Sequence, residues 1–283
     1  MDKIGLLIDS TTNTREELSK YSFIKTAYLK VVVDQEEYLE SELTREDMDK
    51  YLSGSYKLLT SQPSPQNFID LYNEFISEGY THILVVLISE KLSGTYQSAL
   101  VAKTMLENES IDISIHSPKT ASFGIANGIQ ILADKIELGS NFKQIQDLYY
   151  KVFQEPLVTF TLGDLMHLFK GGRLNRVQVL FGTVLRIKPI IEMLNGKLEL
   201  VKKTRTNNAC FEFFVDKIKY YTNKYDSVYL DIIDLNNEEW AQKLEDYVKI
   251  NHPKVVIHRT NYVSPVFFVH LGNKGFGIAI AAY

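Results

Sequence analysis

Hydrophobic and polar positions along this chain form blocks that predict strands and helices in alternation. The clearest block is Ile83–Ile88, an unbroken run of aliphatic residues that is typical of a strand buried on both faces of a sheet. Similar blocks follow one another through the first half of the chain. The expected strands there are Ile4–Ile8, Ala27–Val33, His82–Ile88, Asp112–His116 and Leu157–Thr161, and the expected helices are Thr44–Leu52, Gln66–Glu78, Thr95–Leu106, Ser122–Ile136 and Phe142–Val152.

The second half of the chain begins with a hairpin signal. Asn195-Gly196 separates two apolar segments, and this dipeptide strongly favours a two-residue β-turn. Alternating strands and helices predict an α/β protein, and we expect two α/β domains that can interleave. The first domain (1–158) is expected to have a mainly parallel sheet, and the second domain (159–283) a mixed sheet. The expected strands of the second domain are Ile187–Leu194, Lys197–Lys203, Ser227–Ile233, Val255–Arg259 and Phe276–Ala282, and its expected helices are Thr206–Asn223 and Asn237–Lys249.

Composition indicates an ordinary soluble globular protein. The chain has 283 residues, of which 45% are hydrophobic and 23% charged, and no apolar run approaches the roughly 18–20 residues of a membrane-spanning helix. The short apolar start ends at Asp9, too early for a signal peptide. Cys210 is the only cysteine, which excludes an internal disulfide and a cysteine-rich metal site. We therefore expect a reducing, cytoplasmic setting.

Charge is unevenly distributed. The formal net charge is −4, which disfavours bulk nucleic-acid binding. Between His167 and Arg205, however, nine Lys or Arg residues face two Glu residues, so that this segment carries +7 and the remainder −11. Such a segment is commonly a solvated face; the alternative is a basic patch that meets a phosphate or an acidic partner.

The strongest candidate for ligand chemistry is Ser93-Gly94-Thr95, which follows a predicted strand and opens a predicted helix. Unpaired backbone N–H groups and the helix dipole can hold an anion at such a corner. The glycine would let a ligand approach the backbone, and two hydroxyls flank it. Helix capping alone explains the same residues equally well.

Two further hydroxyls precede another predicted helix. Ser64 and Pro65 suit its N-cap and its first position, which leaves Thr60 and Ser61 free for a different role. No nucleotide-binding glycine motif follows a strand, and the six histidines lack metal-ligand spacing.

Two residues with nitrogen-bearing side chains, Arg173 and His270, lie near glycines. Arg173 follows Gly171-Gly172, where a helical pattern ends, and could pair with a carboxylate or phosphate. His270 stands among apolar residues, as core histidines commonly do, but nearby glycines imply close backbone approach. A hydrolase with Ser93 as nucleophile and His270 as base is one alternative, although the Gly-x-Ser-x-Gly motif and an acid to orient His270 are missing.

Several motifs together resemble the DegV family of bacterial fatty-acid-binding proteins. The resemblance extends from about residue 3 to the carboxyl terminus and depends on the order of the motifs, since each alone is modest. The motifs are Thr60-Ser61-Gln62-Pro63-Ser64-Pro65, Leu92–Ala99, Lys119-Thr120-Ala121-Ser122, Lys170-Gly171-Gly172-Arg173, Ile187-Lys188-Pro189-Ile190 and His270-x-Gly272.

The resemblance implies a fatty-acid tunnel between two α/β domains and a non-catalytic role without cofactor or metal. A separate ATP-dependent kinase subunit would phosphorylate the bound acid, and the acyl phosphate would enter phospholipid synthesis; transient contact with a membrane surface would serve lipid exchange. Apolar residues within 160–169, 180–191 and 266–268 are candidates for the lining of the tunnel, although ordinary core packing is the commoner explanation for each of them. Lys203 and Arg205 would face the kinase, and the carboxylate would be held by Thr60, Ser61, Ser93, Gly94, Thr95, His270 and Arg173.

Some positions depart from the family pattern, and most of them lie near His270. Ser117-Pro118-Lys119 replaces a more usual Asp-Ser-Lys, and Asn273-Lys274 stands where Gly-Pro is common. Leu271 and the bulky pair Phe267-Phe268 replace smaller residues. The resemblance therefore leaves the preferred length and unsaturation of the acyl chain open.

Overall fold

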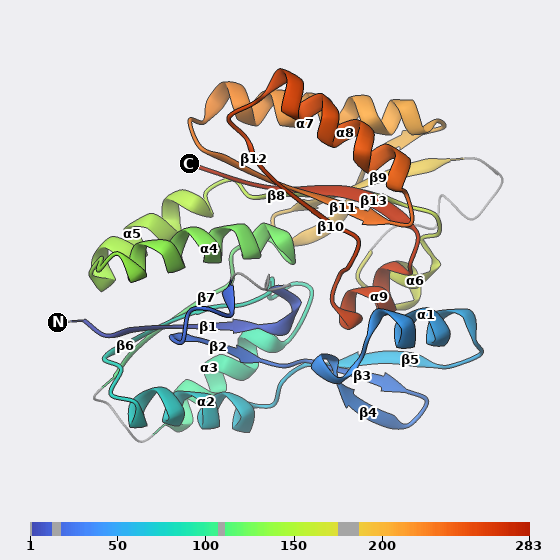
Figure 1. The fold of residues 1–283 in the computed structure, drawn as a ribbon. Helices are drawn as coiled ribbons and strands as arrows, with labels where there is room; N and C mark the ends of the chain where they lie inside the picture. Colours follow the sequence, from blue (N-terminus) through green and yellow to red (C-terminus); the bar gives the residue numbers. More distant parts are fainter. Residues whose placement is uncertain (1, 13–17, 107–110, 175–186) are drawn as a thin grey trace.

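The computed structural model describes residues 2–12, 18–106, 111–174 and 187–283, which form three sheets with helices between and around them (Figure 1). The first sheet is parallel and has the strand order β2-β1-β6-β7. All of β1 is buried, as expected for a central parallel strand. These strands are β1 (Ile4–Asp9), β2 (Ile24–Ala27), β6 (His82–Val86) and β7 (Asp112–His116).

Helices cover both faces of this parallel sheet. On one face lie α2 (Pro65–Ser77) and α3 (Thr95–Met105), and on the other α4 (Phe123–Glu137) and α5 (Phe142–Val152). Ser64 caps α2 and Pro65 is its first residue, which confirms that expectation. No helix in the described ranges is long and apolar enough to cross a bilayer.

The second sheet is mixed and has the order β10-β9-β8-β13-β11-β12. Asn195 and Gly196 form the predicted hairpin turn, with φ values of 50° and 84° that suit the positive-φ turn this dipeptide favours. Helices α7 (Asn207–Lys224) and α8 (Glu238–Asn251) cover its outer face. The strands are β8 (Leu157–Leu162), β9 (Lys188–Leu194), β10 (Lys197–Thr204), β11 (Val228–Leu235), β12 (Val256–Thr260) and β13 (Gly275–Ala282).

Helix α4 lies between the two large sheets (Figure 1). Ile125 and Ile129 pack with β1 and β6, whereas Ile131 packs with Ala281 of β13. The residues of α4 from Phe123 to Ile129 are all buried, as expected for a helix in such an enclosed layer. The observed architecture therefore confirms the predicted α/β class with one parallel and one mixed sheet.

The third sheet was not expected. It has the order β4-β3-β5, formed by β3 (Lys30–Val33), β4 (Glu36–Leu39) and β5 (Leu58–Ser61). The single predicted strand Ala27–Val33 is therefore wrong, because its residues divide between β2 of the parallel sheet and β3 of this one. The 3-10 turns Ser10–Thr12 and Glu40–Glu42 and helix α1 (Arg45–Ser53) complete this region.

A helix from the far end of the chain packs on the small sheet. Helix α9 (Pro265–Leu271) contacts β3 and β5, and also α1 and the short α6 (Met166–Lys170). The two halves of the chain thus share an interface here. The domain boundary at 158/159 stays a prediction; residue 158 lies within β8, whose pairing places it in the mixed sheet.

Asp9 fastens the end of β1 to the end of β6. Its side chain is fully buried and accepts backbone N–H bonds from Thr11 (3.0 Å) and Ile88 (2.6 Å). Burial raises the pKa of this carboxyl from 3.8 to about 6, partly opposed by those bonds and by the Thr11 hydroxyl. Asp9 thereby positions the segment that leads from β6 to Ser93.

Replacement of Asp9 by Asn removes this titrating group. Because the folded-state pKa lies above the unfolded value, the stability that Asp9 contributes is full at low pH and is lost as pH rises through about 6. The free energy of unfolding of the wild type, relative to Asp9→Asn, should fall by about 2 kcal/mol between pH 4 and 7. Urea unfolding at a series of pH values measures this, and a constant difference between the proteins would contradict it.

Candidate functional site

A cavity lies between the mixed sheet, the small sheet and α9. It encloses about 910 Å³ of empty space, its opening to solvent included. Its described lining is mainly apolar, which favours a hydrocarbon ligand. The apolar side chains are Leu29, Ile88, Leu92, Ala121, Val158, Phe160, Leu162, Leu168, Met193, Leu198, Ile233, Leu235, Val263, Val266, Phe267, Leu271 and Phe276.

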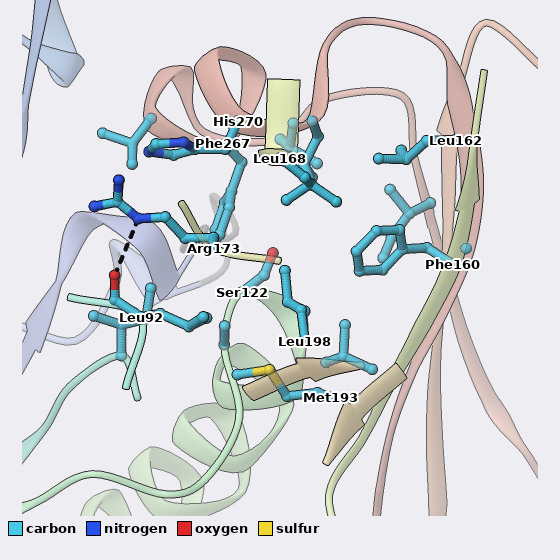
Figure 2. A pocket seen from close by; sticks show the side chains of 18 of the residues that line it. Leu92, Ser122, Phe160, Leu162, Leu168, Arg173, Met193, Leu198, Phe267 and His270 are labelled. Carbon is cyan, nitrogen blue, oxygen red and sulfur yellow. Dashed lines mark hydrogen bonds between the residues drawn. The ribbon is translucent and has the colours of Figure 1, made fainter. Parts of the chain in front are cut away.

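This lining agrees in part with the expected tunnel residues. From the segments named for the tunnel, Phe160, Leu162, Leu168, Val266 and Phe267 line the cavity, and Figure 2 shows four of them around it. Phe169 is 43% exposed and points elsewhere. The candidates Leu180, Phe181, Val184 and Leu185 lie outside the described residues.

One end of the cavity is polar. Thr60, Ser93, Arg173 and His270 all line it, although they come from β5, the segment before α3, the residues after α6, and α9. In Figure 2, Arg173 and His270 lie at the same end, near Leu92. The structure thus brings together four residues that the sequence named as one group.

Thr60 and His270 contact each other directly. The distance from Thr60 Oγ1 to His270 Nε2 is 3.0 Å, and His270 Nδ1 has no hydrogen-bond partner in the described structure. If the imidazole proton is on Nε2, the imidazole donates to Thr60 and the Thr60 hydroxyl can donate onward to a ligand. Burial, reinforced by Arg173 and His167, lowers the pKa of His270 to about 4, so the ring is neutral at pH 7.

Arg173 supplies the positive charge at this end. Its Nε donates to the Leu92 carbonyl (3.3 Å) and its Nη1 to the Gly171 carbonyl (2.6 Å). Among the described residues it has no acidic partner, and no acidic side chain lines the cavity. Burial lowers its pKa, but a guanidinium stays charged at neutral pH. The polar end therefore favours an anion.

Ser93 takes part in the cavity wall, but its neighbours have other surroundings. The Ser93 and Thr95 hydroxyls are 2.8 Å apart, and Ser93 Oγ accepts the Thr95 N–H. Thr95 is fully buried behind Ser93. Gly94 is the N-cap of α3 and does not line the cavity, and the side chain of Gln62 occupies the space where a Cβ on Gly94 would lie. Thr95 and Gly94 thus support Ser93 from behind.

Ser61 does not line the described cavity. It pairs with Lys30 on β3, whereas Thr60 pairs with Val31, and successive strand residues point to opposite faces. The carboxylate role proposed for Ser61 stays a prediction. Lys203 and Arg205 are both exposed on the surface, and their partner-facing role likewise stays a prediction.

Ser122 is a lining residue that the sequence did not single out as a site. Its side chain points into the cavity in Figure 2, and its backbone has φ 55° and ψ −133°. Such values are rare and costly for a residue other than glycine. The motif Lys119-Thr120-Ala121-Ser122 was the available signal, since Ala121 and Ser122 both line the cavity.

Helix α9 is held in place by a buried carboxylate. Glu40 Oε2 accepts the N–H of Val266 at 3.2 Å, and Val266 lies one helical turn before His270. Burial raises the pKa of Glu40. Because α9 carries His270 to Thr60, Glu40 indirectly fixes the polar end of the cavity.

The geometry does not assemble the hydrolase considered above. His270 Nε2 contacts Thr60, while Ser93 Oγ contacts Thr95. No described residue forms a hydrogen bond with His270 Nδ1, where an orienting acid would be needed. The described residues also contain no group of His, Cys, Asp and Glu able to hold a metal ion.

Comparison with known proteins identifies the family. The model of the DegV family, described as uncharacterised proteins, matches residues 3–283. A DegV domain-containing protein from Halalkalibacterium halodurans is 30% identical over 281 residues, covering 99% of this chain and 98% of that protein. The chain belongs to the DegV family. A second DegV domain-containing relative, from Staphylococcus aureus, is 26% identical with 99% of both chains covered.

Solved DegV structures share the whole fold. DegV from Bacillus subtilis, described as a fatty acid binding protein, has a TM-score of 0.88 and 25% identity, with both chains fully covered. A fatty acid binding DegV family protein from Streptococcus agalactiae has a TM-score of 0.89 and 23% identity, again with full coverage. The predicted fold and the DegV resemblance are therefore confirmed.

Gly171 allows His270 its position in this DegV chain. A Cβ added there would lie 2.4 Å from His270 Nδ1 and 3.1 Å from the His167 carbonyl oxygen. Gly171→Ala should displace the imidazole from Thr60 toward solvent and raise its pKa from about 4 toward the ordinary value of about 6.5. An NMR titration of His270 measures this, with the exposed neighbour Lys170→Ala as control. An unchanged His270 pKa in Gly171→Ala would contradict the assignment.

Proposed function

We propose that this protein binds a long-chain fatty acid, with the hydrocarbon chain in the cavity and the carboxylate at Thr60, Ser93, Arg173 and His270. The observation that carries the proposal is an apolar cavity with a cation at its polar end and no acidic side chain in its described lining. An amphiphile with one negative head matches both parts. The solved relatives described as fatty acid binding support the same assignment.

The two parts of the ligand would contribute differently to binding. Each buried methylene contributes about 0.8 kcal/mol, so a sixteen-carbon acid gains about 11 kcal/mol gross, offset by the cost of association. The carboxylate gains less, because it leaves water and must recover its hydrogen bonds from the protein. Affinity would therefore come mainly from the hydrocarbon tail. Arg173 and the hydroxyls would determine the orientation of the acid in the cavity.

The bound acid would then be a substrate for a separate ATP-dependent kinase subunit. A carboxylate oxygen would attack the terminal phosphorus of ATP, forming an acyl phosphate and releasing ADP. Binding through neutral hydroxyls and a cation already engaged with two carbonyls would leave that oxygen more available than a bidentate ion pair would. The protein itself would be a non-catalytic, cytoplasmic carrier that supplies phospholipid synthesis and contacts membranes briefly to exchange lipid.

The first test is to find the ligand. Protein purified from bacterial cells and denatured should release long-chain fatty acids detectable by mass spectrometry, since a preformed apolar cavity would be filled in the cell. Delipidated protein should bind palmitate. Absence of lipid together with failure to bind added long-chain acids would overturn the carrier function.

The same test can locate the carboxylate. A carboxylate beside His270 favours the charged imidazole, so palmitate should raise the pKa of His270 from about 4. Methyl palmitate, which has the same tail and no charge, is the matched ligand and should leave the pKa low. An equal response of His270 to the acid and its ester would contradict the proposed orientation.

The kinase partnership predicts a separation of two activities. Reversing charge with Lys203→Glu and Arg205→Glu should weaken ATP-dependent phosphorylation of the bound acid by a kinase subunit, while palmitate affinity stays unchanged. Lys143→Glu is the control for a charge reversal elsewhere on the surface, because the Lys143 side chain lies on α5 and is 84% exposed. Loss of palmitate binding in the double variant, or equal loss of phosphorylation in the control, would refute this surface.

A further inference from the structure

A second hollow lies beside the cavity and is not used by the proposed function. It is a groove with about 2030 Å³ of empty space, open solvent included. Tyr149 of α5, Phe153 just after α5 and Tyr221 of α7 line it with aromatic rings. Tyr149 and Tyr221 are nearly fully buried, whereas Tyr150 is 64% exposed. The groove thus has a buried aromatic interior and an open rim.

The cavity and the groove are separated by a thin partition. Met193 lines both hollows. On β8, Leu157 lines the groove and the next residue, Val158, lines the cavity. The segment before α4 behaves in the same way, with Lys119 toward the groove and Ala121 toward the cavity. Three separate segments therefore form one partition.

Met193 is the part of this partition that can change most easily. It lies in β9, its side chain is 4% exposed, and it carries no hydrogen-bonding group that must be satisfied. A methionine side chain is unbranched and has three rotatable bonds, so it can turn without movement of the strand. In Figure 2, Met193 lies apart from Arg173 and His270, beyond Leu198. It is thus positioned to meet the tail of a ligand whose head is at Arg173.

We propose that Met193 is the specificity-determining residue that ends the acyl site, and that the aromatic groove is the continuation which Met193 keeps closed. This inference rests on the proposed function, because it assigns the tail end of the same ligand. The ligands it concerns are fatty acids with more than eighteen carbons and acids with a bulky ω-substituent. The occupant of the groove is the tail itself, since the shared residue Met193 places the groove directly next to the cavity.

The groove's chemistry suits a tail that has passed the partition. Leu157 and the aromatic rings offer apolar surface next to Met193. Of the acidic residues that line the groove, Glu155 is paired with Lys224, and Glu192 is paired with Lys217 at 2.8 Å. Two further charged lining residues, Lys119 and Asp216, are exposed to solvent. A hydrocarbon would therefore bury apolar surface there without breaking an existing ion pair.

The test shortens Met193 and compares it with its cross-strand neighbour. Leu198 pairs with Met193 across β9 and β10 and lines the cavity but not the groove. Met193→Ala and Leu198→Ala thus both enlarge the cavity, and only the first shortens a side chain of the partition. Met193→Val, a good strand former, is a second opening variant if the alanine variant folds poorly.

Delipidated proteins are titrated with palmitate, with twenty-two- and twenty-four-carbon acids, and with an acid carrying pyrene at its ω-carbon. Met193→Ala should bind the longer acids and the pyrene acid at least about tenfold more tightly than the wild type, because further methylenes become buried. Palmitate affinity should change by less than about threefold, and Leu198→Ala should keep the wild-type limit on length.

Two other outcomes of these titrations would contradict the proposals. The same profile in Met193→Ala and Leu198→Ala, whether both extended or both unchanged, would overturn the role of Met193 and leave fatty-acid binding intact. Failure of the wild type to bind palmitate would instead overturn the proposed function. The two failures are therefore distinguishable in one set of titrations.

Discussion

The arrangement of the site depends on how Arg173 is satisfied. Two backbone carbonyls, of Leu92 and Gly171, accept its hydrogen bonds, and among the described residues no carboxylate neutralises it. A guanidinium has five N–H donors, so donors remain for an anion. Because the surrounding cavity is apolar, this charge acts at a lower effective dielectric than in water. The other polar groups at this end, a neutral imidazole and hydroxyls, add no competing fixed charge.

The same contacts join the two halves of the chain. Arg173 reaches the segment before α3, and His270 on α9 reaches Thr60 on the small sheet. Glu40 holds the beginning of α9, and Asn273 just after it donates to Asp49 of α1 at 2.7 Å. The polar end therefore exists only while the small sheet, α3 and α9 stay packed together. Ligand binding and the packing of these elements are coupled for this reason.

The sequence predicted where helices and strands lie more securely than it predicted which strands pair with each other. The apolar run Ala27–Val33 indicates extended backbone, but periodicity does not say that its two ends pair in different sheets. Likewise Thr60 and Ser61 were equal candidates from the sequence, and only the pairing of β5 with β3 shows that their side chains point to opposite faces of the sheet. Helix α9 was missed although Ser264-Pro265 has the start signal, because seven residues give little periodicity. Residues that face a cavity from distant strands, as Met193 does, leave no local signal.

Two buried groups give the empty protein opposing responses to pH. Asp9, whose pKa is raised to about 6, loses stabilising effect as pH rises toward that value. The pKa of His270 is lowered from 6.5 to about 4, so the contribution of His270 to stability is lost as pH falls from about 6.5 to about 4. The two effects partly cancel. An anion beside His270 would raise its pKa and reduce the loss on acidification, so mild acid would favour the loaded protein over the empty one until the ligand itself took up a proton.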